Sequence, residues 1–258
     1  MKEPTTAFWT DQDLINALPD FMRVYENRPL KTNKGGMEIQ HAFFAWFTAR
    51  WLRPEAIIES GVFKGQGTWF LHQGHSDAEI FALDPKPQLR EVTIEGAHYL
   101  DSDFSRCDWT QINAANSLVL FDDHQNSLER VKQALWFGFR HILIDDNYCP
   151  GRGDNYSLKE AMLGAGHSHP RSIRRKLGDL LRSLRGWQTS TDNIRPNISD
   201  RVYLLRNVDY YEFPPVYLSE RNRWGDHWSD TKQPLMASPP KPFIEQAASY
   251  TWMCYVSG

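Results

Sequence analysis

The sequence is poor in cysteine, and its few cysteines follow no pairing pattern. Among 258 residues there are three, Cys107, Cys149 and Cys254. The number is odd, the spacings are long and no CxxC motif occurs, so we expect neither a disulfide framework nor a cysteine-type zinc site. This usage favours a reducing compartment, and we therefore expect a cytoplasmic protein.

The sequence also lacks a long hydrophobic run and a strong excess of charge of one sign. No apolar stretch approaches the roughly 20 residues of a membrane span, and the N-terminal residues have no signal-peptide core. The formal net charge of −3 demands neither nucleic acid nor an acidic membrane as a partner. We expect no membrane span and no nucleic-acid partner, whereas a homo-oligomer is compatible with this composition.

Short apolar runs alternate with helix-like segments between residues 55 and 148. Five strands are predicted from the runs AIIES, EIFALDPKP, AHYLDSDF, SLVLFDDH and HILIDDNY. Helices are predicted at residues 37–52, 67–74, 89–95 and 126–139. The alternation indicates an α/β fold, Rossmann-like and doubly wound, with a mostly parallel sheet and helices on both faces.

Each predicted strand ends in an acidic residue. The acids are Glu59, Asp84, Asp103, the pair Asp122 and Asp123, and the pair Asp145 and Asp146. Right-handed crossovers would bring the carboxyl ends of parallel strands to one edge, where such sheets bind their ligands. A single acid at a strand end is usually a helix cap, but five such strands in a row predict a functional site.

Three glycines follow the first strand, at Gly61, Gly65 and Gly67. Glycine allows a tight turn and a close approach of the backbone to a ligand, and the following helix offers unpaired N–H groups. The spacing is not G-x-G-x-x-G, which disfavours a nicotinamide cofactor. A carboxylate at Asp84 can accept two ribose hydroxyls, so we expect a nucleotide-like cofactor here and not a plain turn.

At this point the sequence resembles the class I S-adenosylmethionine-dependent methyltransferases. ESGVFKG matches their first motif, E-x-G-x-x-x-G; FALDPKP is similar to the second; and LDSDF is similar to the segment near the adenine. More narrowly, LVLFDDHQNSLERVKQAL and ILIDDNY resemble the metal-dependent macrocin O-methyltransferase and cephalosporin hydroxylase-like group. The resemblance covers residues 55–150.

The resemblance implies a set of binding residues for S-adenosylmethionine and a metal. The implied cofactor residues are Glu59, Gly61, Phe63, Gly65, Asp84, Asp103, Phe104 and Asp122. The implied ligands of a divalent metal are Asp122, Asp145 and Asp146. Carboxylates with open positions also suit a hard cation such as Mg²⁺ on chemical grounds. The alternative is that these acids cap helices or pair with arginines.

A general base must take the proton of the acceptor, and two neighbouring residues are candidates. His124 is favoured because the ordinary pKa of histidine is near neutrality, and Asp123 is the alternative. The family usually has Asp-Gly-Asp where this chain has Asp122-Asp123-His124, so ligand and base can exchange between the two aspartates. A structural role for His124 also remains open.

The remaining features allow weaker interpretations. His167 and His169 have no partnering motif, and the basic stretch 171–185 is typical of a solvated helix face or of a lid facing an anionic glycan or membrane surface. Tryptophans outside the central pattern either fill the core of an irregular subdomain or stack on sugar rings. Residues 198–213 are compatible with a helix or a strand.

We therefore expect one domain, residues 1–258, that methylates a hydroxyl of a sugar or glycan with a divalent metal. Its parts would be a helical segment (1–54), the cofactor-binding core (55–150), a lid or acceptor-binding elaboration (151–245) and a closing strand (246–258). One alternative is a cephalosporin hydroxylase-like enzyme on the same scaffold. Another is a non-catalytic binding module that kept the fold.

Overall fold

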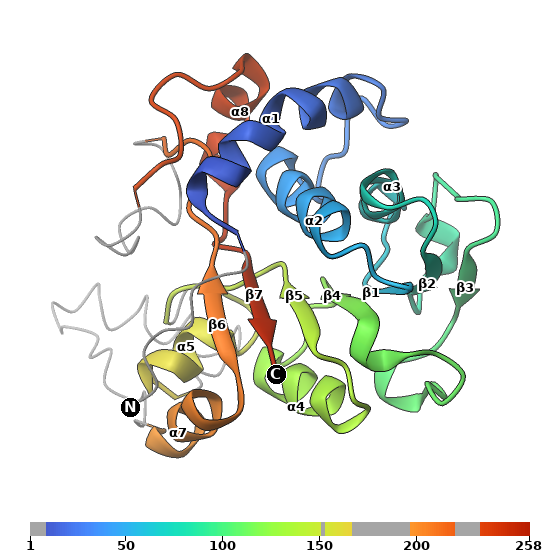
Figure 1. Cartoon of the computed structure of the whole chain (residues 1–258), viewed down its shortest axis with the longest axis vertical. Helices are drawn as coiled ribbons and strands as arrows, with labels where there is room; N and C mark the ends of the chain where they lie inside the picture. Colours follow the sequence, from blue (N-terminus) through green and yellow to red (C-terminus); the bar gives the residue numbers. More distant parts are fainter. Residues whose placement is uncertain (1–8, 151–152, 167–196, 220–232) are drawn as a thin grey trace, which may run out of the picture.

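Seven strands form one sheet in the computed structural model, which describes residues 9–150, 153–166, 197–219 and 233–258. They are β1 (Ala56–Ser60), β2 (Glu79–Leu83), β3 (His98–Leu100), β4 (Ser117–Phe121), β5 (His141–Ile144), β6 (Asp209–Glu212) and β7 (Cys254–Ser257). Their spatial order is β3-β2-β1-β4-β5-β7-β6 (Figure 1). Strands β1 to β5 pair in parallel, whereas β7 runs antiparallel to both its neighbours. The predicted mostly parallel sheet is confirmed.

Helices cover both faces of this sheet. The described helices are α1 (Asp11–Glu26), α2 (Ile39–Leu52), α3 (Gln66–Gly74), α4 (Ser127–Trp136), α5 (Leu158–Leu163), α7 (Ile198–Asn207) and α8 (Lys241–Glu245). Short 3-10 turns are η1 (Pro87–Leu89), η2 (Phe104–Arg106), η3 (Ala114–Asn116) and η5 (Ala247–Ser249). Helices α1, α2, α3 and α8 pack on one face, and α4, α5 and α7 pack on the other (Figure 1). The fold is therefore doubly wound, as predicted.

The central strands are apolar throughout because both of their faces are covered. In β1, Ile57 joins the core under α2, whereas its neighbour Ile58 joins the core under α4. In β4, Leu118 and Val119 divide between the same two cores. Side chains alternate between the faces of a strand, so a strand buried on both sides needs a continuous apolar run.

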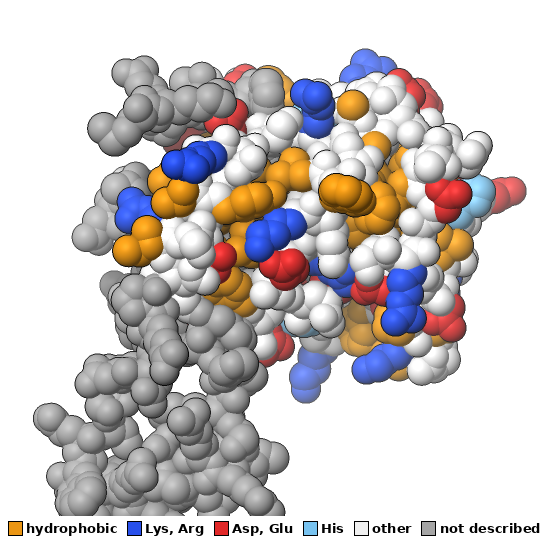
Figure 2. Space-filling model, turned by 90° about the horizontal axis from the view of Figure 1, so that it is seen from below, with side chains coloured by type: hydrophobic (Ala, Val, Ile, Leu, Met, Phe, Trp, Pro, Cys, Tyr) orange, Lys and Arg blue, Asp and Glu red, His pale blue; other side chains and the backbone are white. Residues whose placement is uncertain are grey.

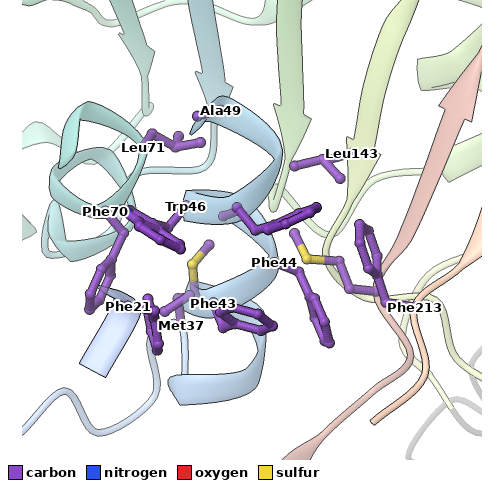
Figure 3. Close-up of a cluster of buried hydrophobic side chains, with 14 of the residues drawn as sticks. Phe21, Met37, Phe43, Phe44, Trp46, Ala49, Phe70, Leu71, Leu143 and Phe213 are labelled. Carbon is purple, nitrogen blue, oxygen red and sulfur yellow. The ribbon is translucent and has the colours of Figure 1, made fainter. Parts of the chain in front are cut away.

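Helix α2 forms the centre of the larger core. Every residue from Ile39 to Ala49 is buried. Figure 3 shows Phe43, Phe44 and Trp46 of this helix packed between α1, α3 and the sheet. Burying one large apolar side chain contributes roughly 1.5–3 kcal/mol, so this helix is a main source of stability. It also holds the polar residue His41 under the ends of the strands.

Most of the predicted elements between residues 37 and 148 are confirmed. All five predicted strands are present as β1 to β5, and the three predicted helices at 37–52, 67–74 and 126–139 are α2, α3 and α4. Helix α4 begins after Asn126, whose side chain accepts a hydrogen bond from the backbone N–H of Glu129. Residues 198–213 contain both a helix, α7, and a strand, β6.

The helix predicted at residues 89–95 is wrong. Only the turn η1 forms there, and the chain then runs against the loop that follows β1. The backbone N–H groups of Glu91 and Val92 both donate to the carbonyl oxygen of Lys64, at 3.0 and 2.9 Å. These tertiary hydrogen bonds replace those that a short helix would have made within itself.

The sequence prediction placed a helical segment at residues 1–54 but did not locate its first helix, α1. It begins with a capping box in which Thr10 and Asp13 bond each other's backbone N–H groups. Its buried residues, Leu14, Leu18 and Phe21, recur at helical spacing. Pro19 lies inside the helix, which a proline usually interrupts. The capping box and the spacing were the signals that could have found it.

The segment expected as a lid contributes to the sheet itself. Within 151–245 the structure describes α5, α7, α8 and the edge strand β6. Figure 2 shows hydrophobic side chains gathered on the surface seen from below in Figure 1. The large exposed apolar side chains of α4, α5 and α7 include Trp136, Leu163 and Ile198. The predictions for His167, His169 and the stretch 171–185 fall outside the described residues. No helix in the described part of the chain is long and apolar enough to cross a membrane.

Candidate functional site

A pocket of about 470 Å³ opens at the carboxyl edge of the sheet. It lies beside the ends of β1, β2 and β4, where the order of strands reverses along the chain. Eight of the predicted site residues line it: Glu59, Gly61, Phe63, Asp84, Asp103, Asp122, Asp123 and His124. The structure therefore brings residues from four strand ends into one site.

Four other predicted residues lie beside the pocket without lining it. Gly65 forms the N-cap of α3, and Phe104 is fully buried against Phe121 and other aromatic rings of the second core. Asp145 and Asp146 follow β5, on the far side of Asp122. Residues that sequence reasoning did not assign also line the pocket, chief among them Arg130 of α4 and the loop residues Asn33, Met37 and Lys86. Gly35 and Gly36, in the loop before α2, line it as well.

The loop after β1 needs glycine at fixed positions. Gly61 has φ +98°, and a Cβ there would overlap the backbone carbonyl group of Asp122. Gly65 has φ +86°, and a Cβ there would overlap the carbonyl oxygen of Val92. A Cβ on Gly67 would overlap the carboxylate of Glu59. The glycines thus let this loop pack tightly between its neighbours and keep its backbone at the pocket wall.

Asp84 holds the backbone of the same loop. Its Oδ2 accepts hydrogen bonds from the N–H groups of Val62 and Phe63, at 3.0 and 2.7 Å. Its Oδ1 accepts the N–H of Lys86 at 2.7 Å. The carboxylate at the end of β2 therefore fixes the wall of the pocket, and its Oδ1, which accepts only one of these three hydrogen bonds, still has a lone pair that can accept a ligand hydroxyl.

Glu59 is buried beneath this loop, with 1% of its surface exposed. Its Oε2 accepts a hydrogen bond from the hydroxyl of Thr68. Burial, together with the nearby charges of Asp84 and Asp145, raises the pKa of Glu59 to about 8, although the hydrogen bond from Thr68 opposes the shift. Glu59 is therefore largely protonated at neutral pH, and it can donate as well as accept at the floor of the pocket.

A second group of acids lies at the ends of β4 and β5. Burial raises the pKa of Asp122 well above its ordinary value, and the charges of Asp145, Asp146 and Glu59 raise it further. Burial and Asp145 raise the pKa of Asp146 as well. Within the described residues, Oδ1 of Asp145 is buried without a donor in good hydrogen-bond geometry. This cluster carries more negative charge than its surroundings neutralise.

His124 lies over this cluster with its backbone in the left-handed region, at φ +54°. Its Nδ1 is 3.3 Å from Oδ2 of Asp146 and 3.3 Å from both carboxylate oxygens of Asp154. Partial burial lowers the pKa of His124, but the charges of Asp146 and Asp154 outweigh it, and the net shift is upward. Donor atoms of Asp122, His124 and Asp146 lie within 4.8 Å of one another, a spacing that a single cation can bridge.

Asp123, by contrast, is engaged by the protein itself. Arg130, whose side chain is 6% exposed, contacts Asp123 Oδ2 at 2.7 Å and Asp103 Oδ2 at 2.6 Å. The hydroxyl of Ser60 donates to Asp123 at 2.7 Å. Asp103 also accepts the N–H of Ser105 and so caps η2. Asp123 and Asp103 therefore share one buried arginine, and Asp103 also caps a turn.

Replacing Arg130 with methionine should lower the free energy of unfolding at pH 7 by about 3 kcal/mol, because it leaves Asp123 and Asp103 without their cation. The guanidinium holds the pKa of Asp103 far below its ordinary value. This contribution is therefore present above the ordinary pKa of aspartate and is lost as the pH falls below it. Urea unfolding at pH 7 and pH 3 should show a smaller difference between variant and wild type at pH 3.

The matched control is Lys132→Met on the same helix. Lys132 pairs with Glu129 at 2.7 Å, but both side chains are at least one-third exposed. Loss of an exposed pair costs at most about 1 kcal/mol. Equal losses for the two variants at pH 7 would contradict the assignment of Arg130 as a buried clamp.

The fold has distant likenesses among solved structures. An O-methyltransferase from Bacillus cereus in complex with SAH is 12% identical, with 98% of this chain and 93% of that chain covered and a TM-score of 0.44. The O-methyltransferase TomG from Streptomyces achromogenes in complex with SAM is 12% identical, with coverages of 98% and 92% and a TM-score of 0.42. An SAH-bound methyltransferase from Podospora anserina is 15% identical, with coverages of 78% and 83% and a TM-score of 0.44. No family model and no curated protein matches the sequence.

Proposed function

We propose that this chain is an S-adenosylmethionine-dependent O-methyltransferase that acts on a hydroxyl of a sugar or glycan with the help of a divalent cation. One observation carries the proposal. One pocket has a glycine loop fixed by Asp84 on one side and, on the other, Asp122 and His124, whose ligand atoms lie within 4.8 Å of those of Asp146. The first arrangement suits a nucleoside cofactor, and the second suits a hydroxyl acceptor.

The proposed cofactor would lie along the ends of β1, β2 and β3. Asp84 would accept a ribose hydroxyl at Oδ1, Glu59 and Gly61 would face the methionine part, and Asp103 would lie near the adenine. Phe63 and Gly65 shape the loop, Phe104 supports the turn that carries Asp103, and Asp122 lies at the methionine end. The sulfonium of S-adenosylmethionine is positive, so the excess negative charge around Asp122 would favour its binding.

The acids at the ends of β4 and β5 fit a hard divalent cation such as Mg²⁺. Asp122, Asp145 and Asp146 supply only oxygen donors, and ligand atoms of Asp122 and Asp146 lie within 4.8 Å of each other. A cation would also relieve the repulsion that raises the pKa of Asp122. When bound, it would lower the pKa of an acceptor hydroxyl.

His124 is the better of the two candidate bases. Asp123 is held by Arg130 and by Ser60, so it is not free to take a proton. The Nδ1 of His124 faces Asp146 and Asp154, and this leaves Nε2 for the acceptor. The acceptor oxygen would bond the methyl carbon as the carbon–sulfur bond breaks. The bonding pair would leave with sulfur as S-adenosylhomocysteine, and the proton would pass to Nε2.

The choice of a sugar or glycan as acceptor depends on the resemblance of the segments around β4 and β5 to metal-dependent sugar methyltransferases. The rival reaction on the same scaffold is a hydroxylation. Product mass distinguishes them, because methylation adds one CH₂ unit and hydroxylation adds one oxygen atom. Most of the rate of a methyl transfer comes from holding acceptor and donor in line, which the pocket between the two groups of residues can do.

The first test is isothermal titration of S-adenosylmethionine and S-adenosylhomocysteine into the purified chain, with Mg²⁺ and with EDTA. We expect micromolar dissociation constants for both ligands, which correspond to a binding free energy of about −8 kcal/mol. Binding of both ligands should persist in EDTA. EDTA removes the cation, but most of the residues proposed to bind the cofactor are not ligands of that cation. Heat signals absent for both ligands in both buffers would refute the methyltransferase proposal.

A further inference from the structure

The two acids after β5 are held from behind by residues far away in the sequence. Asp145 approaches His41 of helix α2, with 3.2 Å between Oδ1 and Nδ1. Asp146 accepts the hydroxyl of Thr251, which precedes β7, with 2.9 Å between Oδ1 and Oγ1. His41, Thr251 and Asp145 are each at most 5% exposed. Two distant segments of the chain thus meet behind one pair of carboxylates.

The protonation of His41 is fixed by a backbone group. The N–H of Thr251 lies 3.2 Å from Nε2 of His41 and donates to it. A backbone N–H is always a donor, so Nε2 must be the acceptor nitrogen of the ring. The ring proton of the neutral imidazole is then on Nδ1, which faces Asp145. His41 therefore presents an N–H, and not a lone pair, to the carboxylate.

Thr251 is itself held rigidly. Its carbonyl oxygen accepts the N–H of Asn147 at 3.2 Å, so it is bonded to the same turn that carries the acids. The next residue, Trp252, is fully buried at φ +59°, a conformation that a bulky residue keeps only where its surroundings impose it. The entry to β7 is thus shaped to place the hydroxyl of Thr251 against Asp146.

We propose that His41 and Thr251 are positioning residues that orient Asp145 and Asp146 toward Asp122 for binding a divalent cation. Partners that hold the ligands of a metal fix their orientation, and loss of one typically costs 10–100-fold in affinity. Here each ligand has its own partner, one on α2 and one before β7. The inference rests on the proposed function only in requiring that these acids bind a cation, and it does not depend on the methyl donor or the acceptor.

The test measures binding of Mn²⁺ alone, by electron paramagnetic resonance, to the full chain and to Thr251→Val. Valine keeps the shape of threonine and removes only the hydroxyl. We expect Mn²⁺ affinity to fall by about 10–100-fold, while the affinity for S-adenosylhomocysteine in EDTA stays within about threefold. The matched control is Thr48→Val in α2, which removes a buried hydroxyl bonded to the carbonyl oxygen of Phe44, distant from the acids.

A second variant, His41→Gln, keeps the result interpretable where Thr251→Val folds poorly. Glutamine can offer an N–H to Asp145, so its Mn²⁺ affinity should exceed that of His41→Leu, which offers none. Equal Mn²⁺ affinities for Thr251→Val and Thr48→Val, or for the two His41 variants, would overturn the proposal. So would a wild type that binds S-adenosylhomocysteine but no Mn²⁺, whereas a wild type that binds Mn²⁺ alone would overturn only the methyl donor.

Discussion

Replacing Asp84 with alanine should weaken the binding of S-adenosylmethionine by at least about 100-fold. Oδ2 of this carboxylate holds the N–H groups of Val62 and Phe63, and Oδ1 would accept a ribose hydroxyl. A hydrogen bond to a charged group contributes about 1.5–3 kcal/mol, so loss of the ribose bond together with the two bonds that hold the loop should weaken cofactor binding by at least about 3 kcal/mol. Each 1.4 kcal/mol corresponds to about tenfold in affinity. Isothermal titration in the presence of EDTA measures the affinity for S-adenosylmethionine without any contribution from a divalent cation.

The matched control for this variant is Asp108→Ala. Asp108 also closes a turn, because its Oδ1 accepts both the N–H and the hydroxyl of Thr110, at 3.0 and 2.7 Å. It lies outside the pocket lining, so its removal should leave the affinity within about threefold. Asp84→Asn, which keeps one acceptor oxygen, should fall between the two. Asp84→Ala with a folded chain and unchanged affinity would show that the cofactor, if bound, lies elsewhere.

The acids at the carboxyl edge of the sheet were predictable because their positions depend on local sequence patterns. Continuous apolar runs predict strands buried on both faces, and an acid directly after such a run must lie at the strand end. Parallel pairing then places Glu59, Asp84 and Asp122 along one edge without any further information. The role of Gly61 was predictable for the same reason, because a tight turn and a close backbone approach after a strand depend on local sequence.

The partners of these acids were not predictable, because they come from distant segments. Arg130 lies in the first turn of α4, after the short loop that follows Asp123. Its pairing with both Asp103 and Asp123 therefore depends on how α4 lies across the strand ends. His41 meets Asp145, and Thr251 meets Asp146, only because β7 inserts beside β5, with the entry to that strand under α2. The order of strands decides these contacts, and no local pattern encodes it.

The same reasoning explains the helix predicted at residues 89–95. Its local pattern was compatible with a helix, but Glu91 and Val92 bond to Lys64 in the loop after β1, and Lys64 lines the pocket. Local propensity is worth a few tenths of a kcal/mol per residue, which two tertiary hydrogen bonds in a packed setting can exceed, at about 1 kcal/mol each. Sequence reasoning was thus reliable for buried strands and unreliable where loops pack on loops.

Replacing Gly61 with alanine should destabilise the fold by more than about 4 kcal/mol, an exceptional loss for one methyl group. The residue lies where β1 ends between its two neighbours: its own N–H donates to Leu83 at 2.9 Å, and the N–H of Asp122 donates to Ser60 at 2.8 Å. A Cβ would overlap the carbonyl group of Asp122 and force these strand ends apart. Asp122 would move with them, away from Asp146 and His124.

Gly96→Ala separates the steric effect from the backbone effect. Gly96 has φ +80°, close to the +98° of Gly61, but a Cβ there would have nothing within 4 Å. The left-handed backbone alone costs alanine roughly 1–2 kcal/mol, and this is the loss expected for Gly96→Ala in urea unfolding. The additional loss of unfolding free energy for Gly61→Ala then measures how closely the ends of β1 and β4 approach at the pocket. Equal losses of unfolding free energy for the two variants would mean that the ends of β1 and β4 can separate freely. The acids of β4 would then not be held in a fixed place beside the loop after β1.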